Sequence, residues 1–382
     1  MEVYILDSLY RRIAVVDKFE SLIWAERMRS AGDFELHIVS SVQNRNLFIP
    51  GVNLATNIST RIMTVETVQD STDDEGRRTL KVTGPSIENV LRQRIIAMDS
   101  AGEWVPWESD EDDPRAIATD MFHDICVTGI LNAGDVISGV TEGSFYPADT
   151  IAEPSELIIY IPDIQDLYTG LKDLCDAYTM GFRLVRHPVT NTLYFDVYMG
   201  SDRTTAQTAL SAVVFSPDLD NLRNTNRLTS SALFKNVAYV VNDTDHEIVY
   251  QDDIDPDIAG FDRRVLFVSC DEGLTSDEMI QKGKDELAKS RMMSALDGQL
   301  ATLTSYIYEV DYYLGDLVEL RDDDGTTSNM QVTEQIFIHD KEGERAYPTL
   351  TVNTFIFPGS WVAWDFAEEW DDLTTEHWDE LP

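Results

Sequence analysis

The chain has 382 residues, with 29 Lys and Arg against 69 Asp and Glu, so its formal net charge is −40 and its isoelectric point is about 4.2. A chain this acidic repels phosphate backbones and anionic lipid, which argues against a sequence-independent nucleic-acid binder and against docking on a membrane surface. Hydrophobic residues make up 43% and aromatic residues 10% of the chain, whereas disordered acidic chains are poor in both. The length suits two or three domains with sizeable cores.

The sequence predicts neither a membrane span nor a signal peptide. The longest apolar stretches, such as residues 157–161 and 237–241, fall far short of the roughly 18–20 residues that a span needs. Residues 1–7 contain no basic region followed by an apolar one. The three cysteines are widely spaced, and we interpret them as reduced structural thiols of a chain made in a cytoplasm: Cys126, Cys175 and Cys270.

Residues 1–97 read mostly as strands. Alternation of apolar and polar side chains predicts strands over residues 3–7, 13–16, 21–29 and 34–38. The runs 61–67 and 79–83 flank a polar loop at 73–76 and predict a hairpin. Ser86 then begins a predicted helix with an apolar stripe of Ile87, Val90, Leu91 and Ile95. We expect a small barrel or curled sheet that this helix closes.

Residues 98–205 mix helices and strands. An acidic loop at 108–113 precedes a predicted helix from Pro114 to about Val127. A strand at 156–160 is followed by a helix that starts with Asp163 as its N-cap, continues through Tyr178 and stops at Gly181. Its inward side chains are Leu167, Leu171, Leu174 and Cys175. Residues 182–185 and 193–198 form a predicted hairpin around residues 190–191.

Residues 206–345 return to strands, which we expect at 213–215, 234–241, 265–269, 300–310, 317–320 and 330–339. A hairpin turn at 322–325 separates the last two strands. Ser276 begins a predicted helix to about Leu296 (helix 276–296), with a stripe of Met279, Leu287, Met292 and Leu296. Two strand-rich domains, 1–97 and 206–345, therefore bracket a mixed α/β domain at 98–205, and residues 346–382 form a C-terminal segment.

The end of the chain is acidic and rich in tryptophan. Residues 361–382 contain eight acids, no Lys or Arg, and four of the seven tryptophans of the chain: Trp361, Trp364, Trp370 and Trp378. Acidic composition alone indicates a solvated tail, but tryptophan is a frequent interface anchor. We expect this segment either to dock on another chain or to fold back on its own domain.

The sequence predicts no catalytic residue, no cofactor and no metal ligand. It lacks the nucleophile elbow, the zinc-protease pair and both glycine-rich phosphate loops. The six histidines have no local partner, and we interpret them as surface or strand residues: His37, His123, His187, His246, His339 and His377. A hydrolase with carboxylates from distant strands stays open as an alternative.

The best calcium candidate is the acidic loop 252–257, since Ca²⁺ takes six to eight oxygen ligands. The EF-hand pattern fails there, because Ile258 and Arg264 stand where Gly and Glu are required. An exposed acidic loop is the ordinary interpretation of this stretch.

A series of short stretches, in order from about residue 3 to about residue 340, resembles a known family. They are YILD at 4–7, SLIW at 21–24, AGDFEL at 31–36, VTGPSIENVL at 82–91, RII at 94–96, YMGSDR at 198–203, VFSP at 214–217, NL at 221–222, KNV at 235–237 and DYYLGDLV at 311–318. Each stretch alone is weak, but their order and spacing are specific. The chain resembles the siphophage minor tail proteins that form the tail-tip hub.

The resemblance implies a fold similar to the baseplate hub proteins of contractile-tailed phages, with two tube-type β-barrel domains bracketing an inserted domain. It implies a homotrimer at the distal end of the virion tail, whose six similar barrels adapt a sixfold tube to a threefold tip. The implied partners are the distal tail protein, the tape-measure protein, and a tip or receptor-binding protein, with DNA present only in transit. Many relatives have Arg where this chain has Pro85. Longer relatives continue into peptidoglycan-cleaving or receptor-binding regions, whereas this sequence stops after its acidic, Trp-rich segment. We therefore expect no enzymatic activity from this polypeptide.

Three functions therefore remain to be compared: a structural hub, a receptor- or carbohydrate-binding tail protein that could depend on Ca²⁺, and a cell-wall hydrolase. Under the hub hypothesis, part of the negative charge lines a lumen that DNA crosses without sticking, and part serves solubility or a saline habitat. We expect Gly32, Gly84 and Gly315 to occupy turns that need positive φ or close backbone approach, and Trp24 and Phe34 to be core residues.

Overall fold

The computed structural model describes residues 1–100, 102–109, 113–151, 164–230, 234–242, 244–251, 254, 256–270, 274–288, 290, 293–300 and 306–352. The chain divides into two compact units. Unit 1 is built on Met1–Asn226 and Leu296–Thr351, and unit 2 on Arg227–Ala295. None of the helices in the described part combines the length and apolar character needed to cross a membrane.

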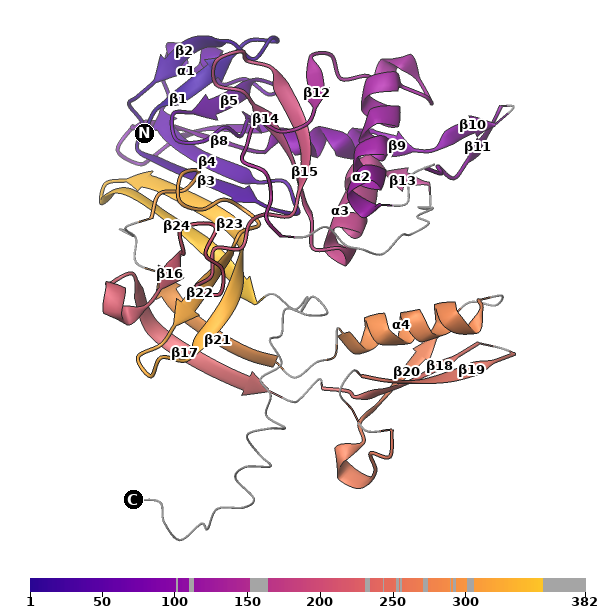
Figure 1. The fold of residues 1–382 in the computed structure, drawn as a ribbon. Coiled ribbons are helices and arrows are strands. Elements are labelled where there is room, and N and C mark those ends of the chain that lie inside the picture. Colours follow the sequence, from indigo (N-terminus) through magenta and orange to yellow (C-terminus); the bar gives the residue numbers. More distant parts are fainter. Residues whose placement is uncertain are drawn as a thin grey trace, which may run out of the picture. The chain divides into compact units, whose positions relative to one another are not determined.

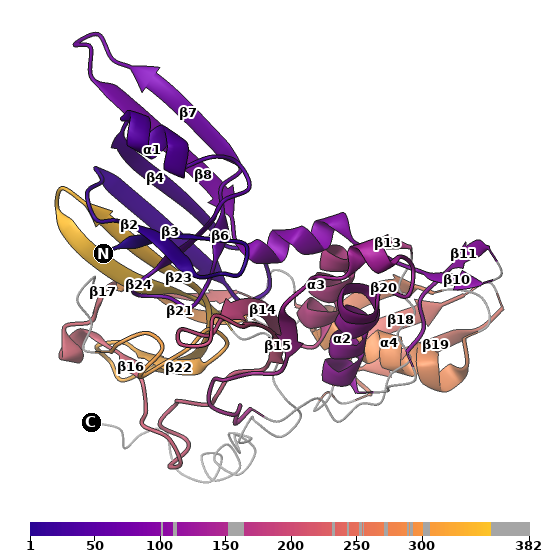
Figure 2. The ribbon, with the colours of Figure 1, turned by 90° about the horizontal axis from the view of Figure 1, so that it is seen from above.

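An eight-stranded sheet forms the frame of unit 1, and both ends of the sequence contribute strands to it. Its order is β16-β22-β23-β3-β4-β8-β7, and β24 pairs with β23 beside this path. Figure 2 shows the purple strands β7 and β8 and the indigo strands β4 and β3 continuing into the yellow strand β23. The strands are β3 Ser21–Arg27, β4 Asp33–Val39, β7 Thr67–Thr72, β8 Arg78–Pro85, β16 Val214–Phe215, β22 Leu317–Arg321, β23 Thr327–Asp340 and β24 Gly343–Val352.

A second sheet packs on the first and encloses the apolar core. It has the order β2-β1-β5-β6, with β1 Val3–Leu6, β2 Arg12–Val16, β5 Asn53–Thr56 and β6 Met63–Thr64. Alternate residues of β4, Phe34, Leu36 and Ile38, are buried against this sheet, as the period-2 pattern predicts. The expectation that Trp24 and Phe34 belong to the core is confirmed, since their exposed fractions are 0% and 2%.

A mixed α/β region follows in unit 1. Two helices, α2 Pro114–Phe122 and α3 Leu167–Ala177, lie beside the three-stranded sheet β12-β15-β14, which consists of β12 Val140–Glu142, β15 Leu193–Tyr198 and β14 Gly181–Arg186 (Figure 1). The rings of Phe122 on α2 and Phe195 on β15 stack with 3.8 Å between their centroids. All four predicted inward residues of α3 are buried, and the predicted hairpin of β14 and β15 is confirmed.

Short elements complete unit 1. They are α1 Val42–Leu47, β9 Ile95–Ile96, β10 Met98–Ser100, β11 Glu103–Val105, β13 Gln165–Asp166, the 3₁₀ helices η1 Ile87–Gln93, η3 Ala133–Asp135 and η4 Pro217–Leu219, and a π-helical turn η2 His123–Thr128 that continues α2. Strands β10 and β11 pair with each other, as do β9 and β13. The predicted turn at 322–325 is also present, with Gly325 at φ +80° between β22 and β23.

Unit 2 is a two-layer α/β structure. Helix α4 Ser276–Ala288 packs on the sheet β19-β18-β20, formed by β19 His246–Tyr250, β18 Val237–Val241 and β20 Val265–Ser269. The residues buried between helix and sheet are Ala238, Val240, Val249, Val268, Met279 and Leu287. A 3₁₀ turn, η5 Gly260–Asp262, precedes β20. Two further strands, β17 Leu222–Ser230 and β21 Met293–Leu300, pair with each other; β17 begins in unit 1 and β21 ends in unit 1.

Several predicted elements of the first half are wrong in place or type. The strand before the loop 73–76 is β7 and not residues 61–67, because Met63 and Thr64 pair instead with β5. The closing helix is the 3₁₀ helix η1, and Ile95 leaves its stripe to pair in β9. Helix α1 and strand β5 were not predicted. Helix α1 buries none of its residues, so it leaves no apolar stripe in the sequence.

The predicted limits of α3 are also wrong. Its N-cap is Asp166, whose carboxylate accepts a hydrogen bond from the Thr169 amide at 3.0 Å, because residues 165–166 first pair with β9. Helix α3 ends at Ala177, and Gly181 opens β14 instead of stopping the helix. Thr179 takes the left-handed turn between them, with φ of +57°. Asp163 and the predicted strand 156–160 lie outside the described residues.

The predicted helix 276–296 is too long, and residues 301–305 of the predicted strand 300–310 lie outside the described residues. Helix α4 ends at Ala288, and Met293–Leu300 form β21 because β17 supplies a pairing partner that helical periodicity cannot reveal. Residues 306–310 form a turn and not a strand. Strands β19 and β24 were not predicted as separate elements. The mainly β fold with a mixed α/β region is confirmed, and the sheets of the described residues do not form a closed barrel.

Candidate functional site

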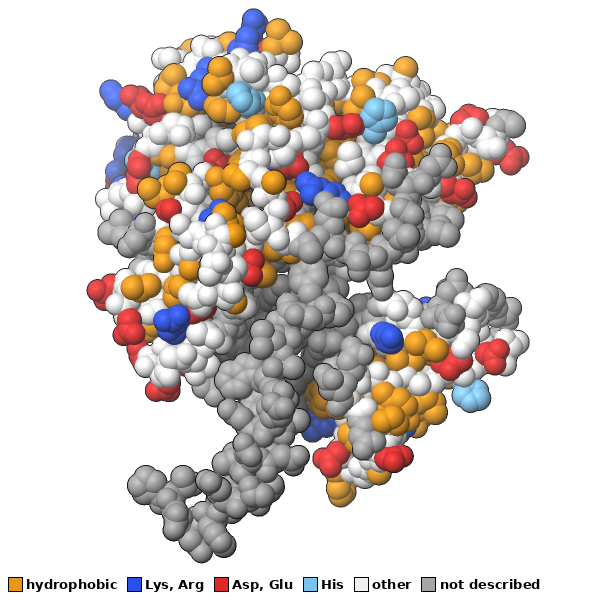
Figure 3. Space-filling view, in the orientation of Figure 1, with side chains coloured by type: hydrophobic (Ala, Val, Ile, Leu, Met, Phe, Trp, Pro, Cys, Tyr) orange, Lys and Arg blue, Asp and Glu red, His pale blue; other side chains and the backbone are white. Residues whose placement is uncertain are grey.

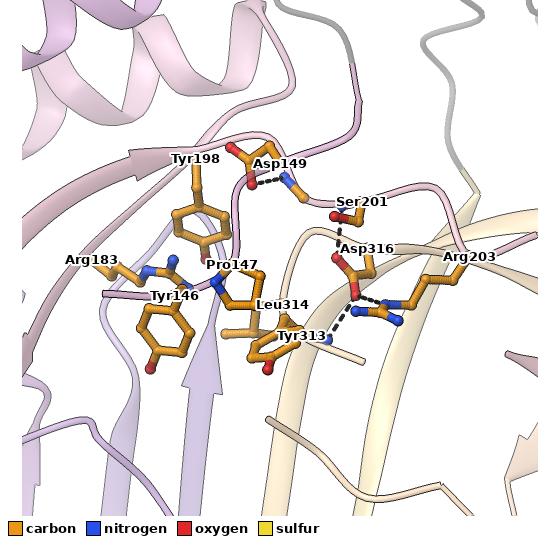
Figure 4. Close-up of a pocket in the computed structure, with 11 residues that line it drawn as sticks. Tyr146, Pro147, Asp149, Arg183, Tyr198, Ser201, Arg203, Tyr313, Leu314 and Asp316 are labelled. Carbon is orange, nitrogen blue, oxygen red and sulfur yellow. Dashed lines mark hydrogen bonds and ion pairs between the residues drawn. The ribbon is translucent and has the colours of Figure 1, made fainter. Parts of the chain in front are cut away.

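The most elaborate polar arrangement of unit 1 lies where three distant segments of the chain meet. Residues 146–149, residues 183–203 and residues 313–316 line a cavity of about 20 Å³, which has room for about one water molecule (Figure 4). We use the name junction for this cavity together with the buried charged residues around it. These are the ion pairs Arg183–Asp196, Arg203–Asp316 and Arg61–Glu88, and the carboxyl groups of Glu26 and Glu309. The segments join the mixed region to the end of the eight-stranded sheet.

Arg183 of β14 is the central cation of the junction. Its Nε and Nη2 donate to one carboxylate oxygen of Asp196 at 2.8 and 2.5 Å, and both residues are buried. The guanidinium also lies 3.8 Å from the ring centroid of Tyr146 and 4.1 Å from that of Tyr198. Burial disfavours its charge, but Asp196 and the two tyrosines keep the pKa of Arg183 above its ordinary value. Arg183 is therefore held as a cation between two rings.

A second buried ion pair joins the two chain segments directly. The Nε of Arg203 donates to Asp316 at 2.6 Å, and the same carboxylate accepts the amides of Ser201 at 2.7 Å and Tyr313 at 3.0 Å. Burial raises the pKa of Asp316 to about 6, although Arg203 opposes this shift. The carboxylate thus fastens residues 313–316 to residues 201–203.

The backbones approach closely at this point because two glycines face each other. Gly200 has φ of +92° and Gly315 has φ of +93°. A Cβ on Gly200 would lie 2.3 Å from the carbonyl carbon and oxygen of Gly315, which no side chain tolerates. This close approach lies beside the ion pair between Arg203 and Asp316.

Tyr146, which contacts Arg183 through its ring, also reaches an acidic cluster of Glu26 and Glu309 through its hydroxyl. Glu26 of β3 is 1% exposed, and it accepts hydrogen bonds from Trp24 Nε1 at 3.1 Å, from the Tyr308 hydroxyl at 3.0 Å and from Ser59. Burial, together with the negative charge of Glu309, raises the pKa of Glu26 to about 7. Glu26 therefore carries a proton far more readily than an ordinary carboxyl group.

Glu309 links this acidic cluster to the mixed region. Its carboxylate accepts the hydroxyls of Tyr146 at 2.8 Å and Thr60 at 2.9 Å, and its own backbone has φ of +62°. A positive φ is strained for a residue with a long side chain, and such strain persists only where neighbouring contacts enforce it. Glu309 binds the hydroxyl of Tyr146, and its neighbour Tyr308 donates to Glu26. Residues 308–309 thus link the segment that carries Tyr146 to strand β3.

A third buried pair ties η1 to the same region. Arg61 and Glu88 form an ion pair and are 4% and 1% exposed. The carboxylate also accepts the amide of Leu184 in β14 at 2.9 Å. The attraction of Glu88 outweighs burial and keeps the pKa of Arg61 above its ordinary value. Glu88 thus connects the helix that follows β8 to the mixed region.

The geometry of the junction supports a structural role. Each buried carboxylate named above already accepts hydrogen bonds or faces an arginine, and the cavity lined by Arg183, Arg203 and Asp316 is the size of a water molecule. Buried ion pairs gain little net stability over apolar contacts, but breaking one is costly, so they specify one arrangement of the segments. The junction can hold three segments in register.

The predicted need for positive φ or close backbone approach is confirmed at all three glycines, but Gly84 lies within strand β8 and not in a turn. Gly315 has positive φ, while a Cβ on Gly32 or Gly84 would lie 2.2 Å from the Ala25 carbonyl oxygen or 1.9 Å from that of Thr64. Cys126 and Cys175 are buried, Cys270 is half-buried, and all three are free thiols. Burial raises the pKa of the Cys126 thiol to about 12, so it stays protonated at neutral pH.

Three of the histidines have carboxylate neighbours that the sequence did not suggest. His37 contacts Glu35 at 2.8 Å, His123 contacts Glu142 at 2.7 Å, and His339 contacts Glu344 at 3.1 Å. All three histidines are partly exposed. His37 and His339 lie on strands, as predicted.

Metal ligands were not expected, and the described residues contain no group of three or more His, Cys, Asp or Glu side chains that could hold an ion. Asp252, Asp253 and Asp255 of the calcium candidate lie outside the described residues, as do His377 and the segment 361–382.

Sequence reasoning found the chain segments of the junction but missed most of its charged residues. The stretches at 198–203 and 311–318, noted for a family resemblance, meet there. Glu26, Arg61, Arg183 and Glu309 were missed because their partners are distant in sequence or occur singly among many acids. A buried-looking strand that contains an arginine, as at 182–185, is the one signal that could have indicated such a pair.

Comparison with known proteins agrees with a tail-protein fold. The 43 kDa tail protein of prophage MuSo2 from Shewanella oneidensis superposes with a TM-score of 0.56 at 14% identity, over 92% of this chain and 98% of that one. A tail protein from Neisseria meningitidis MC58 also gives 0.56, at 12% identity, over 92% and 96%. Prophage tail protein gp18 of Listeria monocytogenes EGD-e gives 0.52, at 12% identity, over 93% and 96%.

No curated protein sequence matches the chain. A family model does match, and it covers residues 2–350, which is nearly the whole described chain. The predicted recognition as a siphophage protein is confirmed by this match, and the fold is that of phage tail proteins. The chain belongs to the family of siphovirus ReqiPepy6 Gp37-like proteins.

Proposed function

We propose that the chain is the hub of a siphophage tail tip, in which three copies join a sixfold tail tube to a threefold tip. In this proposal each copy supplies two tube-type β-barrel domains, residues 1–97 and 206–345, on either side of the mixed domain 98–205. The role is structural, and no catalysis is involved.

The observation that carries this proposal is the seam between β3 and β23. These strands come from opposite ends of the sequence, yet they pair antiparallel, with Trp24 opposite Phe337 and Arg27 opposite Glu334. Arg27 Nε also donates to Glu334 at 2.8 Å. Two regions of one chain thus continue each other's sheet edge to edge, which is the contact that neighbouring subunits of a ring need.

The far end of the same sheet supports extension into a ring. Strand β7 is the last strand of the path, and five of its six residues are exposed. Unpaired strand edges readily pair with another chain, and a closed ring removes them. In the proposed trimer the edge of β7 pairs with a strand of the next copy.

The junction serves the hub by fixing the mixed domain to this sheet. The segments that meet there carry Arg183, Arg203 and Asp316, so a load applied to the mixed domain reaches β22 through buried ion pairs. The neighbours in this proposal are the distal tail protein, the tape-measure protein and a tip or receptor-binding protein. Three copies carry a formal charge of −120, three times −40, around a passage that DNA crosses.

Particle averaging of isolated tails tests the proposal. We expect three copies of the chain in a ring where the sixfold tube meets the tip. Mass photometry of the chain with its tail partners should give a species of three times 43.2 kDa plus those partners. A chain that stays monomeric with all partners present, or that occupies the tail shaft in sixfold symmetry, contradicts the hub.

A pair of charge variants tests the ring contact separately. Gln69→Lys with Ser71→Lys alters exposed positions of the end strand β7, and lysine on an edge discourages pairing. Thr327→Lys with Asn329→Lys makes the same charge change at exposed positions of β23, which already pairs with β22. We expect only the β7 variant to lose trimers. Equal trimer yields from the two variants would exclude pairing through β7.

A further inference from the structure

Unit 2 has one covered and one uncovered sheet face. Alternate residues of its strands point to opposite sides, so Val249 and Val268 lie under α4 while their neighbours Ile248 and Phe267 point away. In the register of the sheet, Tyr239 of β18 lies between Ile248 of β19 and Phe267 of β20. We call this row, with Tyr250 and Arg263 beside it, the open face.

The open face is apolar and accessible. The exposed fractions are 47% for Ile248 and 69% for Phe267, against 4% and 7% for Val249 and Val268 on the covered side. Phe261, two residues before Arg263, is fully exposed. Figure 3 shows hydrophobic side chains gathered on this unit over β18, β19 and β20. A contiguous exposed apolar patch of this kind marks a binding surface.

A cation lies at the edge of the open face. The guanidinium of Arg263 is 5.8 Å from the ring centroid of Tyr239 and 5.6 Å from that of Tyr250, and its Nη2 donates to the Tyr239 hydroxyl at 3.1 Å. Within the described part of the chain, no ion pair joins Arg263 to a carboxylate. The open face therefore favours an occupant that is aromatic or apolar and also negatively charged.

We propose that the C-terminal segment 361–382 of the same chain docks on the open face. This segment carries four tryptophans and eight acids with no Lys or Arg, so its chemistry complements an apolar row with a cation at its edge. Tryptophan and arginine are the residue types that most often anchor interfaces. The inference does not depend on the proposed hub function.

The length of the chain permits this contact in the same molecule. Thirty residues follow β24, and fully extended they span roughly 100 Å. A small domain is about 30 Å across, so the segment is long enough to extend over a whole face of unit 2. Docking within one chain also benefits from a high effective concentration, which a partner in solution lacks.

Acrylamide quenching of tryptophan fluorescence in the full chain tests the proposal. Trp24 and Trp107 are buried, so in a Trp104→Phe background any change in quenching reports on the four tryptophans of the segment. We expect them to be protected, and Phe267→Asp to weaken docking about 30-fold, as loss of an aromatic anchor does. Val189→Asp is the matched control, because Val189 is 80% exposed in unit 1. Equal quenching in the Phe267 and Val189 variants overturns the proposal.

A second variant distinguishes the loss of docking from unfolding of unit 2. Replacing the four tryptophans of the segment by serine leaves every residue of the sheet unchanged, and docking then predicts faster amide hydrogen exchange in β19 and β20. Unchanged exchange overturns the proposal. Tryptophan protection that rises with protein concentration places the segment on another copy and overturns it as well. Arg263→Gln should weaken docking more at low than at high salt, since the charge contribution is screened.

Discussion

The junction of unit 1 buries charged groups, whereas the open face of unit 2 leaves apolar groups exposed to water. In unit 1, carboxylates and arginines are taken out of water and each meets a partner, either across the β14–β15 hairpin, as Arg183 meets Asp196, or from a distant segment, as Arg203 meets Asp316. In unit 2, apolar side chains such as Ile248 and Phe267 stay in water beside a well-packed core. In unit 1 the described residues pair their own buried charges, whereas the exposed apolar side chains of unit 2 need a further segment or chain to cover them.

Breaking a buried ion pair should have the largest effect. Asp196→Ala leaves Arg183 charged and buried, and we expect unit 1 to lose about 3–5 kcal/mol of unfolding free energy. The control is Arg77→Met, which removes pairs with Asp73 and Glu75 at a 74% exposed arginine and should cost at most about 0.5 kcal/mol. Chemical denaturation measures both, and similar losses would mean that the junction is not specifically strengthened.

The backbone contact at the junction should give the next largest effect. Gly200→Ala combines a positive φ with a clash against Gly315, and we expect a loss of about 2–4 kcal/mol. Gly76→Ala is the matched control, because Gly76 has φ of +81° but no atom within 4 Å of the added Cβ. It should cost about 1–2 kcal/mol in denaturant unfolding. If the two variants cost the same, backbone strain alone accounts for Gly200.

The acidic cluster should make the stability of unit 1 depend on pH. The pKa of Glu26 is raised from 4.5 to about 7, so the folded state binds the proton more tightly than the unfolded state does. Its stabilising contribution is complete below pH 4.5 and is lost as the pH rises through 7.

Glu26→Gln isolates this contribution, since a glutamine stays neutral. The unfolding free energy of the variant relative to the parent should rise by about 1–3 kcal/mol between about pH 5 and pH 8. Asp316, whose pKa is also raised, is present in both proteins and cancels from the difference. Parallel pH profiles would show that Glu26 remains ionised in the fold.

The smallest effect is expected on the open face. Ile248 and Val249 are adjacent on β19 but point to opposite sides, so they compare the two faces directly. Val249→Ala should destabilise unit 2 by about 1–3 kcal/mol, because it leaves a cavity under α4. Ile248→Ala should change its stability by at most about 0.5 kcal/mol. Hydrogen exchange in α4 measures both, and a large effect of Ile248→Ala would mean that the open face is part of the folded core.

Local patterns predicted much of the fold. Period-2 alternation found β4 and the hairpin of β14 and β15, and an apolar stripe found the inward face of α3. The glycines were found as well, since a glycine between apolar runs has few other uses. These features depend on neighbours a few residues away, so the sequence carries them.

The errors occurred where a distant partner decided the structure. Residues 293–300 leave the helical pattern because β17 pairs with them, and residues 63–64 leave the predicted hairpin because β5 does. Arg183 could have been noticed as an arginine in an apolar strand, but no local pattern marks Glu26 or Glu309 among 69 acids, because their burial is decided by distant partners and by exclusion of water.

The sequence by itself determined the fold class, the inward faces of the main strands and helices, the strong negative charge and the family. Tertiary structure alone decided which edges pair, as β3 does with β23, and which charges are buried, as Arg183 and Asp316 are. It also decided that one face of β18, β19 and β20 lies under α4 while the other stays exposed. The physical reason is that backbone pairing and desolvation join residues far apart in the chain, whereas sequence patterns report only what lies within a few turns.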